Sequence, residues 1–164
     1  MRENFIKLQP WLGLLARLTL GGVLFAAGYL KIDKIHESQM AVRAYEIFPN
    51  WISNAFGLFL PFVEIVIGAL LILGALTRAM AALGGLIMIA FVIAIAQAWA
   101  RGLNIDCGCF GGGGAVEPGE TKYLQAILRD IGLVFLAGFL IRYPLTKFSL
   151  DKNSKNKTSQ EEMA

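Results

Sequence analysis

The stretch AMAALGGLIMIAFVIAIAQAW, residues 79–99, decides the fold class of this chain. Its one strongly polar residue is Gln97, close to the end of the stretch. An α-helix needs about 20 mostly apolar residues to cross the hydrocarbon core of a bilayer. A strand of a membrane barrel needs only about 9–11 residues, so the length favours a helix. We therefore predict a membrane-spanning helix here.

Three more apolar stretches of similar length accompany it, at residues 11–30, 57–76 and 123–141. The chain is 56% hydrophobic and 16% charged, whereas a soluble protein averages about 25% charged residues. This composition excludes a disordered chain and argues against an ordinary soluble domain. We predict an all-α integral membrane protein, a four-helix bundle over residues 1–149 with a polar, disordered tail at 150–164. A signal peptide is the alternative for residues 11–30, but the apolar run is long for one and three more follow.

The lysines and arginines outside these stretches predict the orientation. Eight lie on the side of both termini and five on the other; the eight are Arg2, Lys7, Arg78, Arg142, Lys147, Lys152, Lys155 and Lys157, and the five are Lys31, Lys34, Arg43, Arg101 and Lys122. We therefore expect a multi-pass protein of a bacterial-type inner membrane, with both termini cytoplasmic. Basic residues are not interleaved with base-stacking aromatics, so we expect lipid and not nucleic acid as the partner of this charge.

The first external loop carries its own helical pattern between Glu37 and Phe48. Its apolar residues fall on one helical face, and Pro49 and Asn50 stop the run; the face comprises Met40, Ala41, Ala44, Tyr45 and Phe48. We predict a short helix lying in the external membrane interface. It would serve as a lid or partner surface, or simply connect two spans.

The chain has two cysteines, Cys107 and Cys109, in the run DCGCFG at residues 106–111. A bridge between residues two apart closes almost no loop, so a purely stabilising disulfide is a weak explanation. Packing cysteines are also a weak explanation, because the neighbours are Asp106, Gly108 and further glycines. A metal site would need about four ligands, and the chain offers one histidine and no second cysteine pair.

A reversible dithiol and disulfide is the remaining interpretation of the two cysteines. So short a ring strains the disulfide, and strained, exposed disulfides exchange readily. Gly108 lacks a Cβ and permits the backbone angles that ring closure requires. A nearby cation would favour the attacking thiolate, and Arg101 and Arg129 are the candidates, whereas Asp106 would oppose it.

Glu64 and Arg129 are ionisable residues inside predicted spans, where such residues usually face a partner in the bundle interior. Counted from the expected external ends of their helices, they lie at similar depths of roughly 9–10 Å. We therefore expect them to form an ion pair beneath the cysteine loop, which either fixes helix packing or relays protons. Asp130 is a competing partner for Arg129, and Arg17 is a poorer partner for Glu64.

The chain resembles the MauE/DoxX group of small four-span membrane proteins, and the MauE branch most, over roughly residues 12–142. The resemblance rests on GYLK at 28–31, LPFVE at 60–64 with Gly68, RG at 101–102, DCGCFG at 106–111 and LRD at 128–130. The cysteine run, which includes Phe110, distinguishes the MauE branch. The resemblance implies a redox-associated membrane protein that acts beside a periplasmic thioredoxin-like protein, in maturation of the type that methylamine dehydrogenase undergoes.

Three interpretations of function stay open on this sequence. In the first, Cys107 and Cys109 exchange electrons with the thioredoxin-like partner, which leaves open whether the chain is itself a thiol–disulfide oxidoreductase. In the second, it is a non-enzymatic membrane subunit or assembly factor. In the third, by resemblance to DoxX, it passes electrons from sulfur compounds to quinone, although no motif specifies a quinone site. A transporter is disfavoured by the absence of an internal repeat and the scarcity of polar residues.

Overall fold

The computed structural model describes residues 2–108, 112–117, 121–144, 146 and 149–150. Its elements in chain order are α1 (Arg2–Ile32), α2 (Ile35–Ala44), α3 (Asn50–Leu73), α4 (Thr77–Ala100), β1 (Ile105–Asp106), β2 (Gly114–Ala115) and α5 (Tyr123–Arg142). Cys109, Phe110 and the predicted tail from residue 151 onward lie outside the described residues.

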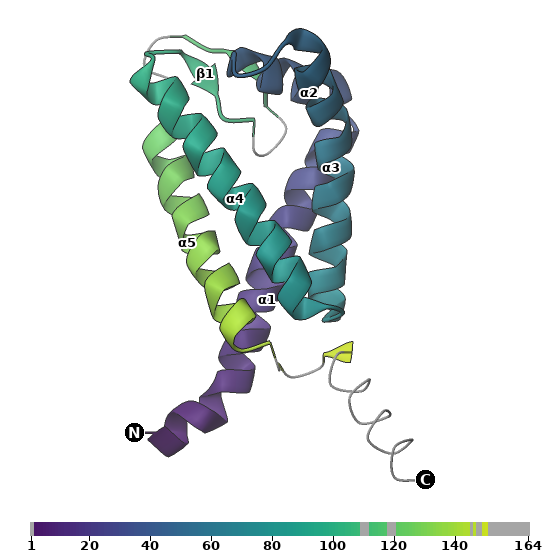
Figure 1. The fold of residues 1–164 in the computed structure, drawn as a ribbon, viewed down its shortest axis with the longest axis vertical. Coiled ribbons are helices and arrows are strands. Elements are labelled where there is room, and N and C mark those ends of the chain that lie inside the picture. Colours follow the sequence, from purple (N-terminus) through teal and green to yellow (C-terminus); the bar gives the residue numbers. More distant parts are fainter. Residues whose placement is uncertain (1, 109–111, 118–120, 145, 147–148, 151–164) are drawn as a thin grey trace.

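Four of these helices are long and apolar enough to cross a membrane. The spanning segments are Leu8–Ile32, Asn50–Leu73, Thr77–Ala100 and Tyr123–Arg142. They lie side by side along one axis in Figure 1, with the beginning of α1 and the end of α5 at the same end of the bundle. The predicted all-α fold with four membrane-spanning helices is confirmed.

The bounds of α3 are shifted toward the N-terminus relative to the predicted residues 57–76. The helix begins at Asn50, directly after Pro49, and ends at Leu73. It ends there because Gly74 adopts the left-handed conformation with φ of 71°, which a glycine accepts without strain and which stops a helix. The early start adds two turns in which Asn50, Ser53 and Asn54 interrupt the apolar residues, so a search for an unbroken apolar run misses them.

Small residues let α1 and α3 approach each other closely. A Cβ on Gly28 would lie 2.5 Å from the carbonyl oxygen of Pro61, and a Cβ on Gly68 would lie 2.6 Å from the backbone nitrogen of Phe25. Close backbone contact through small residues is a common way for membrane helices to associate. Large apolar side chains fill the rest of the interior, among them Leu20, Leu24, Ile67, Leu71, Met88, Leu133 and Leu140.

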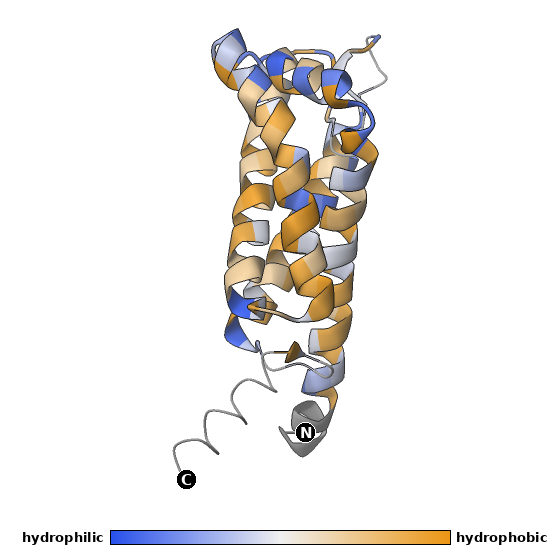
Figure 2. Cartoon of the chain, turned by 90° about the vertical axis from the view of Figure 1, so that its right-hand side faces the viewer, coloured by the Kyte–Doolittle hydropathy of each residue, from blue (hydrophilic) through white to orange (hydrophobic). Residues whose placement is uncertain are grey.

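Hydrophobic residues cover the length of the bundle, while hydrophilic residues gather at its ends and at one level inside it (Figure 2). Large apolar side chains also point outward along the spans; Phe59, Leu86 and Phe135 are each more than 60% exposed. An apolar belt of this height around a helical bundle suits contact with lipid tails.

One end of the bundle is covered by α2 and the β1–β2 hairpin, which together we call the cap (Figure 1). The predicted short helix at 37–48 exists, but it covers Ile35–Ala44. Of the predicted apolar face, Ala41 and Tyr45 are buried, whereas Met40 and Phe48 are each more than 40% exposed. The helix is therefore packed against protein through a narrower face than a membrane-interface helix would bury.

Candidate functional site

Cys107 directly follows β1 and lies in the turn of the hairpin. Strand β1 pairs with β2 in antiparallel register, with Ile105 opposite Ala115 and Asp106 opposite Gly114. We call the described residues between the two strands, Cys107, Gly108, Gly112 and Gly113, the cysteine loop. A sheet of two strands, each two residues long, carries this loop at one end of the bundle.

Helix α2 is the platform on which this loop lies. A Cβ on Gly108 would lie 2.6 Å from the Cβ of Ala41, and one on Gly113 would lie 2.3 Å from the carbonyl oxygen of Glu37. Gly108 also has a positive φ of 64°, which other residues rarely adopt. Glycine at these two positions lets the loop lie flat against the helix.

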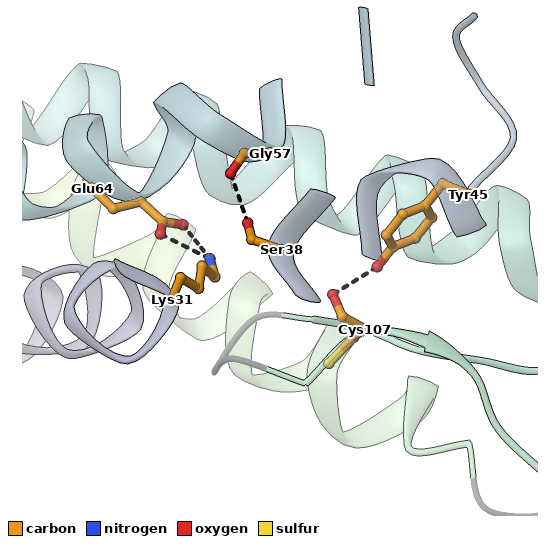
Figure 3. A network of polar contacts seen from close by, with 6 residues as sticks. All are labelled: Lys31, Ser38, Tyr45, Gly57, Glu64 and Cys107. Carbon is orange, nitrogen blue, oxygen red and sulfur yellow. Dashed lines mark hydrogen bonds and ion pairs between the residues drawn. The ribbon is translucent and has the colours of Figure 1, made fainter. Parts of the chain in front are cut away.

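Tyr45, the residue directly after α2, holds the backbone of Cys107. Its hydroxyl donates a hydrogen bond of 2.9 Å to the carbonyl oxygen of Cys107 (Figure 3). The carbonyl of Tyr45 in turn accepts hydrogen bonds from Gln97 at 3.0 Å and from Arg101 at 3.2 Å. The cysteine is thereby connected through Tyr45 to the end of α4.

Arg101 has a different position from the one that the sequence suggested. Its guanidinium forms an ion pair of 2.7 Å with Glu46 on the exposed side of the cap. Arg101 is not among the described residues that line the cavity beside Cys107, and its ion pair stabilises the cap instead. Of the two cations expected near the thiol, the structure brings Arg129 to that cavity.

Tyr123 fixes the hairpin from the other side. Its buried hydroxyl donates a hydrogen bond to the carbonyl of Leu103 and accepts one of 3.0 Å from the backbone nitrogen of Ile105. Because Tyr123 is the first residue of α5, the strand and the helix that follows it are held together. The start of the hairpin is therefore tied to two spanning helices, to α4 through Tyr45 and to α5 through Tyr123.

An open cavity of about 370 Å³ lies beside Cys107. Its lining combines the hairpin with the first two turns of α5 and comprises Asp106, Cys107, Gly112, Lys122, Gln125, Ala126 and Arg129. This volume is within the range of pockets that hold small molecules or a segment of a partner chain. Cys107 therefore lies beside an open cavity, with two cations and one carboxylate around it.

A buried ion pair lies inside the bundle below the cap. The ammonium nitrogen of Lys31 is 2.8 Å from each carboxylate oxygen of Glu64, and the two side chains are 2% and 0% exposed (Figure 3). The predicted pairing of Glu64 with Arg129 is therefore wrong: the partner of Glu64 is Lys31. Helix α1 continues through Ile32, so Lys31 is inside the bundle and not in the loop to which the charge count assigned it.

Arg129 instead pairs with its neighbour Asp130. Its Nε and Nη2 atoms both lie 2.7 Å from Oδ1 of Asp130. Adjacent helix positions point in different directions, but the long arginine side chain folds back to reach the carboxylate. Asp130 is completely buried, and its Oδ2 atom has no hydrogen-bond partner in the described part of the chain. The alternative that Asp130 competes for Arg129 is thus correct.

These charges meet at one level of the bundle. A small cavity of about 10 Å³ is lined by Glu64, Asp130 and Arg129 together with apolar residues of α1 and α4. The ammonium of Lys31 lies 5.3 Å from the ring centre of Phe91, which lines the same cavity. The cavity is about the size that one water molecule needs. Helices α1, α3 and α5 therefore bring two cations and two anions, Lys31, Arg129, Glu64 and Asp130, into one charge cluster, and α4 lines the cavity there with Met88 and Phe91.

Arg17 lies away from this cluster, as expected. Its Nη1 atom donates a hydrogen bond of 2.8 Å to Thr146, which follows α5 at the opposite end of the bundle from the cap. Ser149 binds the carbonyl of Gly74 at 2.9 Å in the same region. Arg17 therefore helps to hold the segment after α5 against the turn between α3 and α4.

Sequence reasoning missed Lys31, Tyr45 and Lys122 as members of the site. Lys31 and Glu64 each end one of the motifs quoted above, GYLK and LPFVE, and that shared position was the available signal. For Tyr45 and Lys122 the sequence offered none, since their roles depend on which loops meet at the cap. Within the described ranges, no three His, Cys, Asp or Glu side chains are arranged to hold a metal ion.

Comparison with known proteins identifies the family of this chain. The chain is 36% identical over 106 residues to a methylamine utilization protein MauE of Methylorubrum extorquens, covering 64% of this chain and 57% of that protein. It is 30% identical over 131 residues to a methylamine utilization protein MauE of Paracoccus denitrificans, covering 79% of this chain and 68% of that protein. No solved structure matches. The family model described as methylamine utilisation protein MauE matches residues 9–143, so this multi-pass membrane protein belongs to the MauE family.

Proposed function

We propose that this protein carries out thiol–disulfide exchange with a soluble, thioredoxin-like partner on the outer side of the membrane. The observation that carries the proposal is the open cavity at the cap, which gives access to Cys107 beside the cations Lys122 and Arg129. A thiolate is the attacking species in exchange, and neighbouring positive charge stabilises it. Tyr45 and the platform of α2 hold the backbone of the cysteine in place for that attack.

The exchange takes place in two balanced steps. A thiolate of Cys107 or Cys109 attacks one sulfur of the partner's disulfide, which forms a mixed disulfide and releases the partner's second sulfur as a thiolate that takes up a proton. The remaining cysteine of this chain then attacks the mixed disulfide, which releases the reduced partner and leaves a disulfide between Cys107 and Cys109. Two electrons have passed to the partner, and the same steps reversed pass them back.

We further propose a bacterial-type inner membrane, with both termini in the cytoplasm and the cap in the periplasm. Since Lys31 is buried in the bundle, the basic residues on the cap side fall from five to four, against eight on the side of the termini. The charge bias that orients membrane proteins is therefore larger than the sequence count indicated. Membrane-impermeant maleimide should label the cysteines in intact spheroplasts, and labelling only after membrane disruption would refute this orientation.

The names of the two relatives connect them with methylamine utilisation. We propose that the exchange reaction of this chain supports maturation of a disulfide-containing periplasmic protein of that metabolism, of the methylamine dehydrogenase type. The relatives are longer than the part that matches, since the aligned segment spans 57% of one and 68% of the other. The family model matches residues 9–143, which include the cap and the spans on which this proposal depends.

Cysteine trapping tests the exchange reaction. The chain has two cysteines, so the Cys107→Ser and Cys109→Ser variants each leave one thiol and the double variant leaves none. We expect one single variant to accumulate a reductant-sensitive covalent adduct with a thioredoxin-fold protein in membranes, and the double variant to form none. We also expect alkylation of the wild type to rise by two groups after reduction.

Two results would contradict the proposal. An alkylation count that is unchanged by reductant, with no adduct in either single variant, would remove the exchange reaction. Full maturation of the client in cells that carry the double serine variant would favour a non-enzymatic membrane subunit or assembly factor instead. A cysteine-independent transfer of electrons from sulfur compounds to added quinone would favour the DoxX-like alternative.

A further inference from the structure

Arg129 lines two separate cavities of this protein. It belongs to the open cavity beside Cys107, and it also belongs to the small buried cavity that Glu64 and Asp130 line. Its side chain is 29% exposed, whereas that of Asp130 is 1% exposed. The guanidinium therefore lies at the boundary between the cysteine site and the buried charge cluster.

The acid on the buried side holds Arg129 by only one of its oxygens. Both contacts of 2.7 Å go to Oδ1 of Asp130, while Oδ2 has no hydrogen-bond partner among the described residues. A completely buried carboxylate oxygen without a partner is costly, and a protonated carboxyl group or one bound water would relieve that cost. The adjoining cavity of about 10 Å³ is about the size that this water molecule needs.

We propose that Arg129 is a positioning residue whose positive charge is shared between Asp130 and the thiolate of Cys107, so that the ionisation of Asp130 controls the reactivity of the cysteine. The inference deepens the proposed exchange function and rests on it. An ionised Asp130 holds the guanidinium inward and weakens its support of the thiolate. A protonated Asp130 releases that charge toward the cysteine cavity. Formation of the thiolate in turn favours protonation of Asp130, since such coupling is reciprocal.

The other charged groups near Arg129 do not replace it in this role. Lys31 belongs to the same charge cluster as Asp130, but both oxygens of Glu64 bind its ammonium. Lys122 lines the cavity from an exposed position, where solvent and salt screen its charge. Asp106, also exposed, opposes the thiolate from the hairpin side.

Removal of either partner should change thiol reactivity in opposite directions. In the full-length chain with Cys109→Ser, Cys107 is the only thiol, and its reaction with maleimide across pH reports the fraction of thiolate. We expect Asp130→Asn to raise the labelling rate at neutral pH about tenfold, the effect of one unit charge at roughly 10 Å with an effective dielectric constant of about 20. We expect Arg129→Gln to lower the rate by a similar factor, and Arg129→Lys to stay near the parent.

A matched control is Leu128→Ala, because Leu128 is the residue before Arg129 and is 61% exposed on the outside of the bundle. That variant should leave the pH profile unchanged. The inference is overturned if Asp130→Asn leaves the profile unchanged or slows labelling, or if Arg129→Gln and Arg129→Lys label at equal rates. Partner trapping in the same variants separates the two proposals. Exchange that persists with an unchanged profile overturns this inference alone.

A second measurement needs no substitution at Asp130, which guards against a variant that does not fold. Cys107 in the Cys109→Ser chain is modified either with a neutral methanethiosulfonate or with one that carries a sulfonate. The anionic adduct imitates the thiolate, so it should increase the infrared band of a protonated carboxyl group relative to the neutral adduct. Equal bands for the two adducts would overturn the coupling.

Discussion

The buried pair of Lys31 and Glu64 allows a quantitative test of what holds the bundle together. Its ammonium lies 2.8 Å from both carboxylate oxygens, and the side chains are 2% and 0% exposed. At that separation and an effective dielectric constant of about 20, the attraction is about 6 kcal/mol. The cost of removing both groups from water offsets much of it, so the net value of the pair is small although the loss of one member is severe.

We therefore expect Lys31→Met to lower the free energy of unfolding by about 3–5 kcal/mol, since it leaves Glu64 buried without a cation. Glu64→Leu should cost less, because the stranded Lys31 lies near Asp130, which has an unused carboxylate oxygen. The double variant should return to within about 1 kcal/mol of the wild type or exceed it, since a well-packed apolar pair replaces a buried ion pair at little cost.

Reversible unfolding in mixed micelles, followed by fluorescence of the three tryptophans, measures these differences. The matched control is Lys34 with Glu37, an exposed pair at 3.3 Å whose side chains are 57% and 39% exposed. The same cycle there should give an interaction of less than about 1 kcal/mol. Additive losses in the buried cycle, with a double variant as unstable as the sum of the single variants, would refute the reasoning.

Three smaller perturbations address the cap and the helix interface. Tyr45→Phe should leave the fold intact but lose about 1 kcal/mol from the hold on the Cys107 carbonyl, measured as faster hydrogen exchange in the cysteine loop. Gly108→Ala should displace the loop, because its Cβ would lie 2.6 Å from that of Ala41 at a positive φ, and the maleimide labelling rate should change without loss of thermal stability of the bundle. Gly28→Val should lower the thermal unfolding temperature in detergent, since a Cβ there would meet a backbone carbonyl of α3 at 2.5 Å.

The number and placement of the membrane spans followed from the sequence because apolar length alone decides them. Their ends depended on features that a hydropathy count does not weigh. Helix α3 begins directly after Pro49, where polar residues still interrupt the apolar ones, and Gly74 ends that helix by its left-handed conformation. The caps of a helix are local and readable in principle, but only after the start of the helix has been placed correctly.

The charge cluster shows why the site was harder to predict than the fold. Lys31 was assigned to the loop because the apolar run ends at Leu30, and a lysine at the end of a span normally extends outward to the interface. It points inward because α1 continues to Ile32 and because a completely buried Glu64 lies opposite on α3. The same misplaced start of α3 made the depths of Glu64 and Arg129 seem equal. Which residues pair across helices depends on rotation about the helix axes, which a span count does not give.

The residues of two quoted motifs explain each other once they are placed in the structure. Gly28 and Pro61 bring the backbones of α1 and α3 together. Three residues later in each helix, Lys31 and Glu64 form their ion pair. Ser38 then binds α2 to α3 at the carbonyl of Gly57 over 2.9 Å, so the platform below the cysteine loop is attached to the same interface (Figure 3).

The consequence of this arrangement is mechanical as well as electrostatic. The α1–α3 interface sets the position of α2, and α2 sets the position of Cys107 through Tyr45 and through contact with Gly108. Helix α5 approaches the same loop from the other side, through Tyr123 and the cavity that Arg129 lines. A shift of α5 relative to α1 and α3 would therefore change both the distance from Arg129 to the thiol and the contacts within the buried cluster. Because separating two cations from two anions is costly, the cluster resists such a shift and keeps α5, and with it Arg129, in place beside the cavity at Cys107.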